Sequence, residues 1–381
     1  MSGMLSDDDF MAWFRLLETP GVGRETARQL LAACGSPAQV FNADPEQLRQ
    51  WVGPVVAAGL KQLPPLFDDR LQTALAWRRG GPQRHVLTLG DSAYPSALLQ
   101  SADPPLLLYV NGDVSCLGAR SLAIVGSRGA TAQGLDNARA FAAALCRQGW
   151  TVVSGLAQGI DGAAHEGALS VAGAVGAATT IAVVGTGLDI VYPPRHRGLA
   201  QRIAESGAVV SEFAPGTPAL PNNFPQRNRI IAGLSLGTLV VEAALKSGSL
   251  ITARLASEAG REVFALPGSI HAPQAKGCHA LIKQGAKLVE SVEDILEELR
   301  SPPLPGLVPS RAPPRTTEQS EPAEQHRPLV LALGHDPMTL DALQARTGWP
   351  AQDLLAALME LELSGHVARL PGGLYQRRGL G

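Results

Sequence analysis

The chain holds little that would support a disulfide framework, a metal site or a membrane span. Its four cysteines, Cys34, Cys116, Cys146 and Cys278, are scattered through 381 residues without Cys-x-x-Cys or Cys/His spacing. No unbroken apolar run approaches the ~20 residues that a bilayer requires, and the acidic N-terminus lacks the features of a signal peptide. These absences predict buried free thiols, no bound metal, no membrane association and a cytoplasmic location.

The motif of a dinucleotide cofactor site is also absent. Residues 126–131 do not read G-x-G-x-x-G, and the predicted strand 151–155 ends in Ser154-Gly155 without a carboxylate for a ribose. Gly185 and Gly187 form a G-x-G without the third glycine, which is either a tight turn beside a phosphate or a turn that needs positive φ. We therefore expect no nicotinamide or flavin cofactor.

The middle of the chain contains a series of short apolar segments that end in small residues. They cover residues 122–128, 151–155, 181–187, 208–212 and 238–242, with helix-like segments between them. This alternation predicts an α/β fold with a doubly wound parallel sheet. Ligands of such sheets bind at the carboxyl ends of the strands, where Gly and Ser let backbone N–H groups approach an anion. The predicted ligand therefore carries phosphate.

The net charge of −2 conceals an uneven distribution along the chain. Residues 120–287 hold 15 Lys and Arg against 9 Asp and Glu, a surplus of six positive charges. The surplus is either gathered on one face, as nucleic-acid binding would require, or spread over the surface. Charge alone leaves both alternatives open.

Basic residues and one aromatic residue are predicted to meet at the same edge of the sheet. The candidate DNA contacts are Gly126, Ser127, Arg128, Ser154, Gly155, Gly185, Gly187, Arg195, Arg197, Phe224, Arg227, Asn228, Arg229, Lys246, Ser247 and Gly248. Phosphate-reaching cations, backbone donors and an aromatic ring that stacks on a base together describe a groove for a single-stranded polynucleotide.

Three acidic or titratable residues offer an alternative, catalytic interpretation. Asp161 and His165 stand four residues apart and could form an acid/base pair on one helix face, but the position of Asp161 favours a structural cap. Glu242 ends a predicted strand and is expected to anchor a loop or a basic partner. No nucleophile has a convincing partner, so the sequence predicts binding rather than catalysis.

Several longer motifs follow one another along the chain. They are YPSALLQSADPPLLLYVNG (94–112), VGSR (125–128), SGLAQGIDGAAHEGAL (154–169), VVGTGLDIVYP (183–193), SEFAPGTPALPNNFPQRNRIIAGLS (211–235), VVEAALKSGSLITA (240–253) and ALPGSI (265–270). In this order they resemble the DNA-processing protein A family, also called DprA or Smf. Departures are His279, where Asn is expected, and the Gly/Ala-rich stretch 171–180, which is longer than the family's usual loop.

The resemblance carries several expectations. It implies an extended Rossmann-like domain that binds single-stranded DNA without enzymatic activity, protects incoming DNA during natural transformation, loads the RecA recombinase and forms homodimers. The family's phosphate-binding arginine falls on Arg128 and its basic loop on Arg195 or Arg197. Its F-x-x-R-N-R segment falls on residues 224–229 and its K-S-G-S segment on residues 246–249.

Composition divides the chain into four parts. Residues 1–84 are helical and resemble a sterile-alpha-motif or helix-hairpin-helix domain, which holds DNA phosphates or contacts protein. Residues 85–300 form the sheet domain, and residues 301–327 form a Pro-rich flexible linker. Residues 328–381 resemble a winged helix, but its third helix, 351–363, contains no Lys or Arg. This favours protein contact over reading of duplex DNA.

Two other functions compete with single-strand binding. Gly237-Thr238 followed by Glu242 echoes the G-G-x-G-T-x-x-E segment of lysine-decarboxylase-like enzymes that hydrolyse nucleoside monophosphates, but the preceding glycines are absent and Glu242 is displaced by one residue. A sequence-specific regulator acting through the winged helix is the other. Nucleoside release from monophosphates tests the first, and a comparison of duplex with single-strand binding tests the second.

Overall fold

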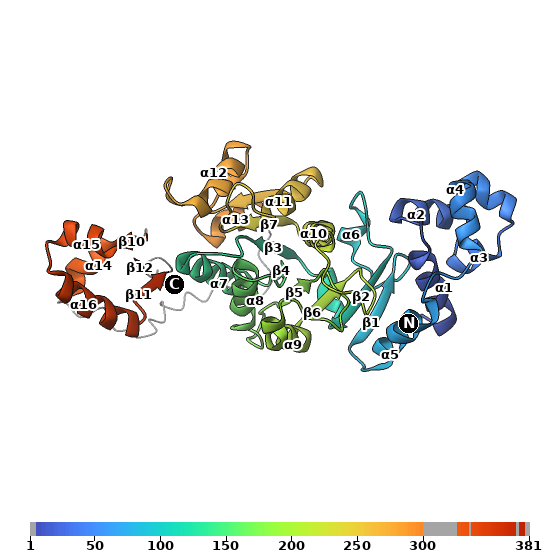
Figure 1. Cartoon of the computed structure of the whole chain (residues 1–381), viewed down its shortest axis with the longest axis horizontal. Coiled ribbons are helices and arrows are strands. Elements are labelled where there is room, and N and C mark those ends of the chain that lie inside the picture. Colours follow the sequence, from blue (N-terminus) through green and yellow to red (C-terminus); the bar gives the residue numbers. More distant parts are fainter. Residues whose placement is uncertain (1–4, 300–325, 335–336, 371–372, 378–381) are drawn as a thin grey trace.

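A nine-stranded sheet forms the centre of the computed structural model, which describes residues 5–299, 326–334, 337–370 and 373–377 (Figure 1). The strand order is β1-β2-β6-β5-β4-β3-β7-β8-β9. The strands from β6 to β9 in this order are parallel: β6 (Ala208–Ser211), β5 (Thr180–Val183), β4 (Thr151–Ser154), β3 (Ser121–Val125), β7 (Gly237–Val240), β8 (Glu262–Ala265) and β9 (Lys287–Leu288). The predicted α/β fold with a large parallel sheet is confirmed.

All five predicted strands are present, and each ends one to four residues earlier than expected. The small residues at their ends already belong to the turns that leave the sheet. Four further strands were not predicted: β1 (Arg84–Thr88), β2 (Leu107–Gly112), β8 and β9. The strands β8 and β9 continue the parallel part of the sheet beyond β7. The strands β1 and β2 extend its other end, because β2 pairs antiparallel with β6 and β1 antiparallel with β2.

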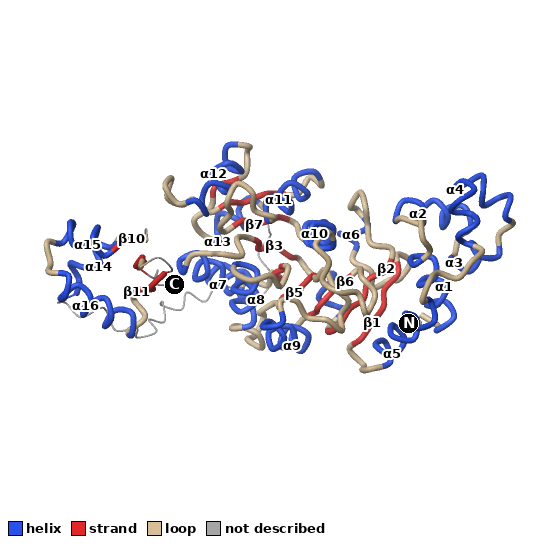
Figure 2. The backbone as a smooth tube through the Cα atoms, in the orientation of Figure 1, coloured by secondary structure: helices blue, strands red, loops and turns tan. Residues whose placement is uncertain are grey.

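Helices cover both faces of the sheet (Figures 1 and 2). One face packs on α7 (Ala132–Arg147), α8 (Ile160–Leu169), α9 (Arg197–Ser206) and α13 (Val292–Glu298), and the other on α6 (Ser96–Leu99), α10 (Asn223–Leu234), α11 (Ser249–Glu258) and α12 (Lys276–Lys283). Side chains of β3 alternate between the two cores: Leu122 and Ile124 face one, Ala123 and Val125 the other. A strand buried on both faces must be apolar throughout, which is the pattern that the sequence displays.

The order of the strands reverses at β3. The chain moves outward from β3 through β4 and β5 to β6, and then returns to place β7 on the other side of β3. The loops after β3 and β7 therefore leave the sheet in opposite directions, which opens a crevice at their carboxyl ends.

Five helices precede the sheet: α1 (Asp7–Glu18), α2 (Arg24–Cys34), α3 (Pro37–Asn42), α4 (Pro45–Leu60) and α5 (Phe67–Arg79). The predicted helical N-terminus is thus confirmed. Phe10 and Phe14 of α1 and Phe67 of α5 share one core with Tyr109 of β2. The Tyr109 ring makes T-shaped contacts with Phe10 of α1 and with Trp77 of α5. The helices α1 and α5 therefore cover the antiparallel extension of the sheet.

The C-terminal elements agree with the predicted winged helix. They are α14 (Arg327–Leu333), β10 (Met338–Thr339), α15 (Leu340–Thr347), α16 (Ala351–Leu363), β11 (Val367–Leu370) and β12 (Leu374–Arg377). The predicted third helix has the same bounds as α16. The predicted linker at residues 301–327 lies outside the described residues up to position 325.

Three of the four cysteines are the buried free thiols that the sequence predicted, and Cys34 is the exception. Cys116, Cys146 and Cys278 are buried free thiols, while Cys34 is half-buried. Within residues 5–299 and the described C-terminal segments, no helix is both long and apolar enough to cross a membrane.

An ion network joins the N-terminal helices to the sheet. Arg24 Nε and Arg28 Nη1 of α2 donate to the two carboxylate oxygens of Asp103, each at 2.7 Å. Arg229 of α10 donates to Asp103 at 3.0 Å and to Glu212 at 2.5 Å. Burial acts to raise the pKa of Asp103, but hydrogen bonds from Arg28 and Arg229 outweigh it and lower the pKa to about 2. Asp103 is therefore the link between α2 and α10.

We expect Asp103 to stabilise the fold at neutral pH and to lose this contribution in acid. Its pKa is ~3.9 in an unfolded chain and about 2 in the folded protein. The stabilisation is full above the unfolded value and disappears as the pH falls through the folded value. It amounts to ~1 kcal/mol after allowance for solvent screening of the partly exposed carboxylate.

Urea unfolding of Asp103→Asn from about pH 5 to pH 2 should reveal a lower free energy of unfolding at pH 5 than in the wild type, and a shallower decrease as the pH falls. The control is Asp8→Asn at the exposed start of α1; the same acid dependence in both variants would contradict the role of Asp103.

Candidate nucleic-acid interface

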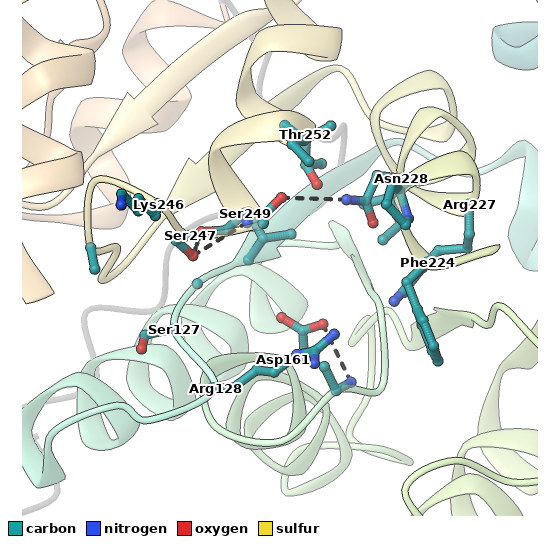
Figure 3. Close-up of a pocket in the computed structure, with 18 of the residues that line it drawn as sticks. Ser127, Arg128, Asp161, Phe224, Arg227, Asn228, Lys246, Ser247, Ser249 and Thr252 are labelled. Atoms are coloured by element: carbon teal, nitrogen blue, oxygen red, sulfur yellow. Dashed lines mark hydrogen bonds between the residues drawn. The ribbon is translucent and has the colours of Figure 1, made fainter. Parts of the chain in front are cut away.

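A cavity of about 700 Å³ opens at the carboxyl ends of β3 and β7, where the strand order reverses (Figure 3). Six segments line it: the loop after β3, the loop that leads into α8, Tyr192 of the loop after β5, the loop after β6, one face of α10, and the loop after β7 with the first turns of α11. The cavity thus occupies the crevice that the sheet topology creates.

Two exposed cations flank the cavity. Arg128 belongs to the loop after β3 and Lys246 to the loop after β7, and they lie on different sides of the opening in Figure 3. Among the described residues, neither side chain has a hydrogen-bond or ion-pair partner. Both charges are therefore available to an anionic ligand.

An aromatic platform lies beside Arg128. The Phe224 ring is half-buried, and its centroid lies 5.4 Å from that of Tyr192 with the ring planes inclined by 45°. The Arg128 guanidinium carbon lies 5.8 Å from the centroid of Phe224. A Cβ at Gly185 would come within 3.2 Å of the Phe224 ring, so the end of β5 packs directly against it. This packing holds the ring in place at the cavity wall.

The floor of the cavity holds a buried arginine and a buried aspartate. Arg227 Nη1 donates to the carbonyl oxygen of Val183 at 2.6 Å, and burial lowers the pKa of Arg227 to about 10, which leaves it charged at neutral pH. Asp161 accepts from the backbone N–H groups of Gly155 and Ala157 at 3.2 and 3.4 Å. Burial raises the pKa of Asp161, and the charge of Arg227 opposes that rise.

Asp161 therefore organises the loop before α8. The predicted helix cap is wrong, because Gly159 holds the N-cap position and Asp161 lies within the first turn of α8. His165 does not join it in an acid/base pair. Its Nδ1 lies 2.7 Å from the hydroxyl of Thr180, and burial lowers the pKa of His165 to about 3. The imidazole is thus neutral and enclosed.

Hydrogen bonds of polar side chains hold the loop after β7. Asn228 of α10 donates through Nδ2 to the carbonyl oxygen of Gly248 at 3.4 Å, and the hydroxyls of Ser247 and Ser249 lie 2.7 Å apart. Glu242 accepts from the backbone N–H of Thr131 at 2.9 Å and from its hydroxyl. The role of Glu242 as a loop anchor is what the sequence predicted.

The arrangement offers two free cations, hydroxyl groups and an aromatic face around a cavity open to solvent. The hydroxyls of Ser127, Ser247, Ser249 and Thr252 line its wall. Such a surface suits a ligand with several phosphates and at least one planar base.

Comparison with known proteins identifies the family. The profile described as DNA recombination-mediator protein A matches residues 85–300. The chain belongs to this family. A second profile, the DprA winged helix domain, matches residues 312–373. The resemblance that the motifs predicted is therefore confirmed.

Individual members of the DNA recombination-mediator protein A family are similar over most of their length. Protein Smf of Escherichia coli (strain K12) is 44% identical over 313 residues, which cover 81% of each chain. The crystal structure of DNA processing protein A from Streptococcus pneumoniae superposes with a TM-score of 0.66 at 35% identity, over 77% of this chain and 98% of that one. A structure that describes the single-stranded DNA binding mode of DNA processing protein A from Helicobacter pylori has a TM-score of 0.51 at 30% identity, over 56% of this chain and 95% of that one.

Nine of the sixteen predicted contact residues line the cavity: Gly126, Ser127, Arg128, Phe224, Arg227, Asn228, Lys246, Ser247 and Gly248. Of these, Arg227 is buried in the floor of the cavity, with only 4% of its surface exposed, so it acts on a ligand through its charge rather than by direct contact.

The structure places three predicted arginines away from the cavity. Arg229 points from α10 toward Asp103 and Glu212, where it takes part in the ion network. Arg195 and Arg197 belong to the exposed segment formed by η2 (Pro194–His196) and the start of α9. Their side chains are exposed but lie outside the lining of this cavity.

The remaining four predicted residues have packing roles. Ser154 is fully buried and donates to the carbonyl oxygen of Ile124 at 2.6 Å. A Cβ on Gly155 would lie 1.9 Å from Arg227 Nη1, and one on Gly187 would lie 2.6 Å from the carbonyl oxygen of Ala214. Neither Gly185 nor Gly187 has positive φ, so close approach rather than turn geometry explains both.

Sequence reasoning did not assign Tyr192, Ser249 and Thr252 to the site. It also treated residues 224–229 as a cluster rather than as part of a helix. The signal was present, because Phe224 and the lining residues at positions 227, 228 and 231 have the i, i+3, i+4, i+7 spacing of one helix face.

Proposed function

We propose that this protein binds single-stranded DNA in the cavity at the carboxyl ends of β3 and β7. The observation that carries the proposal is the pair of unpartnered cations, Arg128 and Lys246, in a cavity that is also lined by the Phe224 platform. The cations bind the phosphates, and the aromatic ring stacks on a base with little dependence on which base it is. Arg195 and Arg197, exposed at the start of α9, are the proposed contacts for a strand that leaves the cavity.

Membership of the DNA recombination-mediator protein A family supports a more specific proposal. We propose that the protein protects incoming DNA in the cytoplasm during natural transformation, loads the RecA recombinase onto it, and acts as a homodimer through the sheet domain. It does so by binding rather than by chemistry. In support, Asp161 and Glu242 are engaged with backbone N–H groups of the loops they organise.

Hydrolysis of nucleoside monophosphates is the less favoured alternative. Glu242, its candidate acidic residue, accepts two hydrogen bonds from Thr131, and burial raises its pKa. The carboxylate is thereby committed to the loop before α7. Incubation with a panel of monophosphates should release no nucleoside.

A mobility-shift titration with single-stranded and duplex oligonucleotides tests the proposal. We expect the full chain to bind single-stranded DNA more tightly than duplex of the same length, with little dependence on sequence. The affinity should fall as salt rises, because each phosphate contact releases counterions. Equal or tighter binding of duplex would contradict the proposal and favour a regulator that acts through the winged helix.

Removal of the winged helix should leave binding of a short single strand unchanged. The third helix, α16, carries Asp353, Glu360 and Glu362 and no Lys or Arg, and its exposed side chains include Leu355 and Met359. We therefore propose that this helix contacts protein. Truncation after Arg300 should preserve the affinity measured by the same titration.

The comparison requires both proteins to have the same oligomeric state in solution, because halving the number of linked sites weakens apparent affinity through lost multivalency alone. A several-fold loss in a truncated protein of unchanged oligomeric state would return the winged helix to the DNA-binding surface.

A further inference from the structure

A smaller cavity, of about 320 Å³, runs along α9 on the side of this helix that faces β6 and β2 (Figure 1). We call it the α9 groove. The two alanines that α9 contributes, Ala200 and Ala204, stand one helical turn apart and leave the helix surface flat. The rest of the floor is apolar as well: Leu156, Val184, Leu188 and Val209. A planar ring without charge therefore fits this floor.

Polar side chains stand at the two ends of the groove. Arg197, at the start of α9, is exposed, and among the described residues it has no hydrogen-bond or ion-pair partner. Glu205 in the last turn of α9 and the amide of Asn111 on β2 also line the groove. A guanidinium binds a phosphate, whereas amide and carboxylate groups hydrogen-bond to the edge of a base. Because the Glu205 carboxylate repels a phosphate, a nucleotide enters with its phosphate at Arg197 and its base toward Asn111.

The segment that carries Arg197 is fastened to the groove floor. His196 Nδ1 lies 2.9 Å from the carbonyl oxygen of Leu156. Leu156 has a φ of +56°, a left-handed conformation that a leucine rarely adopts, and its side chain lies in the groove. Such a conformation persists where the surrounding structure enforces it, and it is frequent at ligand sites. The groove and its cation are thus held in a fixed relation.

The α9 groove and the first cavity are separated by a thin wall. At two places, consecutive residues divide between them: Leu156 lines the groove and Ala157 the cavity, and Val191 lines the groove and Tyr192 the cavity. The Cα atoms of consecutive residues are only ~3.8 Å apart. A strand that leaves the first cavity past the exposed Tyr192 ring therefore reaches Arg197 and the groove next.

We propose that the α9 groove binds one nucleotide of the DNA strand that leaves the first cavity, with the base on the apolar floor and the phosphate on Arg197. The inference rests on the proposed function of the first cavity. The volume of about 320 Å³ lies at the lower end of the ~300–1,000 Å³ usual for ligand pockets, which suits one nucleotide rather than several. Proteins hold an unstacked base in this way, between apolar walls and hydrogen bonds to its polar edge.

Strands that lack bases at one end isolate the groove. Fluorescence anisotropy is measured on the full chain with an oligothymidylate of about 12 nucleotides and with the same strand made abasic over one half, in both orientations. The abasic half keeps its phosphates and lacks only the bases. A strand of about 6 thymidines, chosen to fill the first cavity alone, completes the set.

Four variants separate the base from the phosphate. Ala204→Leu fills the floor, Asn111→Leu removes the hydrogen bonds to the base edge at nearly constant volume, and Arg197→Ala removes the phosphate contact. The matched control is Arg202→Ala, which removes an exposed arginine from the same helix but lines neither the groove nor the first cavity.

The wild type should bind the full strand several-fold more tightly than the half-abasic strand. Ala204→Leu should bind both with the lower affinity, because the base that it displaces is the one that the abasic strand lacks. Its salt slope should stay unchanged, since no phosphate contact is lost, whereas Arg197→Ala should make the slope shallower by about 0.7. Asn111→Leu should also weaken the full strand alone, and it decides the test if Ala204→Leu lowers the melting temperature. All variants should bind the short strand within about twofold of wild type, and Arg202→Ala should change no strand.

The outcomes separate the groove from the proposed function. If the wild type binds the full and half-abasic strands equally, and Ala204→Leu and Asn111→Leu weaken neither, the groove holds no base while the first cavity remains. If Arg128→Ala weakens no strand, the proposed function itself fails.

A free nucleotide has the same chemistry as a nucleotide of the strand, so thymidine monophosphate is titrated separately. The protein for this titration is Arg128→Ala, in which the first cavity has lost a cation. The strand is excluded as the occupant if two results coincide. Thymidine monophosphate would raise the melting temperature of Arg128→Ala but not of Arg128→Ala/Ala204→Leu, and Ala204→Leu alone would bind the full strand as the wild type does. The groove would then be assigned to a free nucleotide.

Discussion

Replacement of Arg128 by alanine should weaken binding of single-stranded DNA by ~1.5–3 kcal/mol, or about 10- to 150-fold. Arg128 is exposed at the cavity, and among the described residues it has no hydrogen-bond or ion-pair partner, so its N–H donors are available to a phosphate. A guanidinium on a phosphate makes charge-assisted hydrogen bonds, which lie at the strong end of their class. The salt slope should become shallower by about 0.7.

The matched control for Arg128 is Arg147→Ala, which removes the same charge from the exposed C-terminal end of α7, just before the amino end of β4 and away from the carboxyl ends where the cavity lies. A general electrostatic effect would weaken binding in both variants alike. If Arg128→Ala keeps its fold by circular dichroism and binds with unchanged affinity and salt slope, Arg128 does not belong to the site.

Replacement of Phe224 by alanine should cost ~1–3 kcal/mol of binding free energy, with little dependence on base identity. The ring is half-buried against Tyr192 and lies beneath the Arg128 guanidinium, so one edge of it faces the cavity. Removal of the ring deletes the stacking surface and also the contact that orients Arg128. Titration with oligothymidylate and oligoadenylate measures the loss and its sequence dependence.

Two further substitutions separate stacking from packing at this position. Phe224→Tyr keeps an aromatic face and should retain most of the affinity, whereas Phe224→Leu keeps apolar bulk and should lose it. Because Arg128 lies over the ring, the double variant Arg128→Ala/Phe224→Ala should lose less than the sum of the single losses. A drop in melting temperature with intact binding in Phe224→Ala would assign the ring to the core.

The sheet could be predicted because its signal is local. Each of the five parallel strands from β3 to β7 is buried along its whole length, so its apolar run is continuous and small residues mark the turn after it. The parallel strands β8 and β9 are short and partly exposed, and they were not predicted. The antiparallel strands β1 and β2 were not predicted, since nothing within residues 84–88 or 107–112 indicates pairing with β6. Their place depends on α1 and α5, which cover them from the N-terminal end of the chain.

In the candidate site, too, local sequence patterns predicted some features, and the tertiary structure decided others. The sequence placed Arg227 and Arg229 in one basic cluster, but both lie on α10, where residues two apart point to nearly opposite sides. Arg227 thus lies beneath the cavity, and Arg229 joins the ion network. Sequence spacing alone did not reveal this because the helix at residues 223–234 had not been located.

By itself the sequence determined the α/β class, the five parallel strands from β3 to β7, the family, the winged-helix order and the loops that carry Arg128 and Lys246, because each of these depends on short-range patterns. The tertiary structure decided which cations remain free. Arg229 forms ion pairs with Asp103 and Glu212, which come from other segments of the chain. Among the described residues, no carboxylate forms an ion pair with Arg128 or Lys246. Whether an arginine can receive a phosphate depends on the partners that folding brings to it, and those partners come from segments up to 126 residues away.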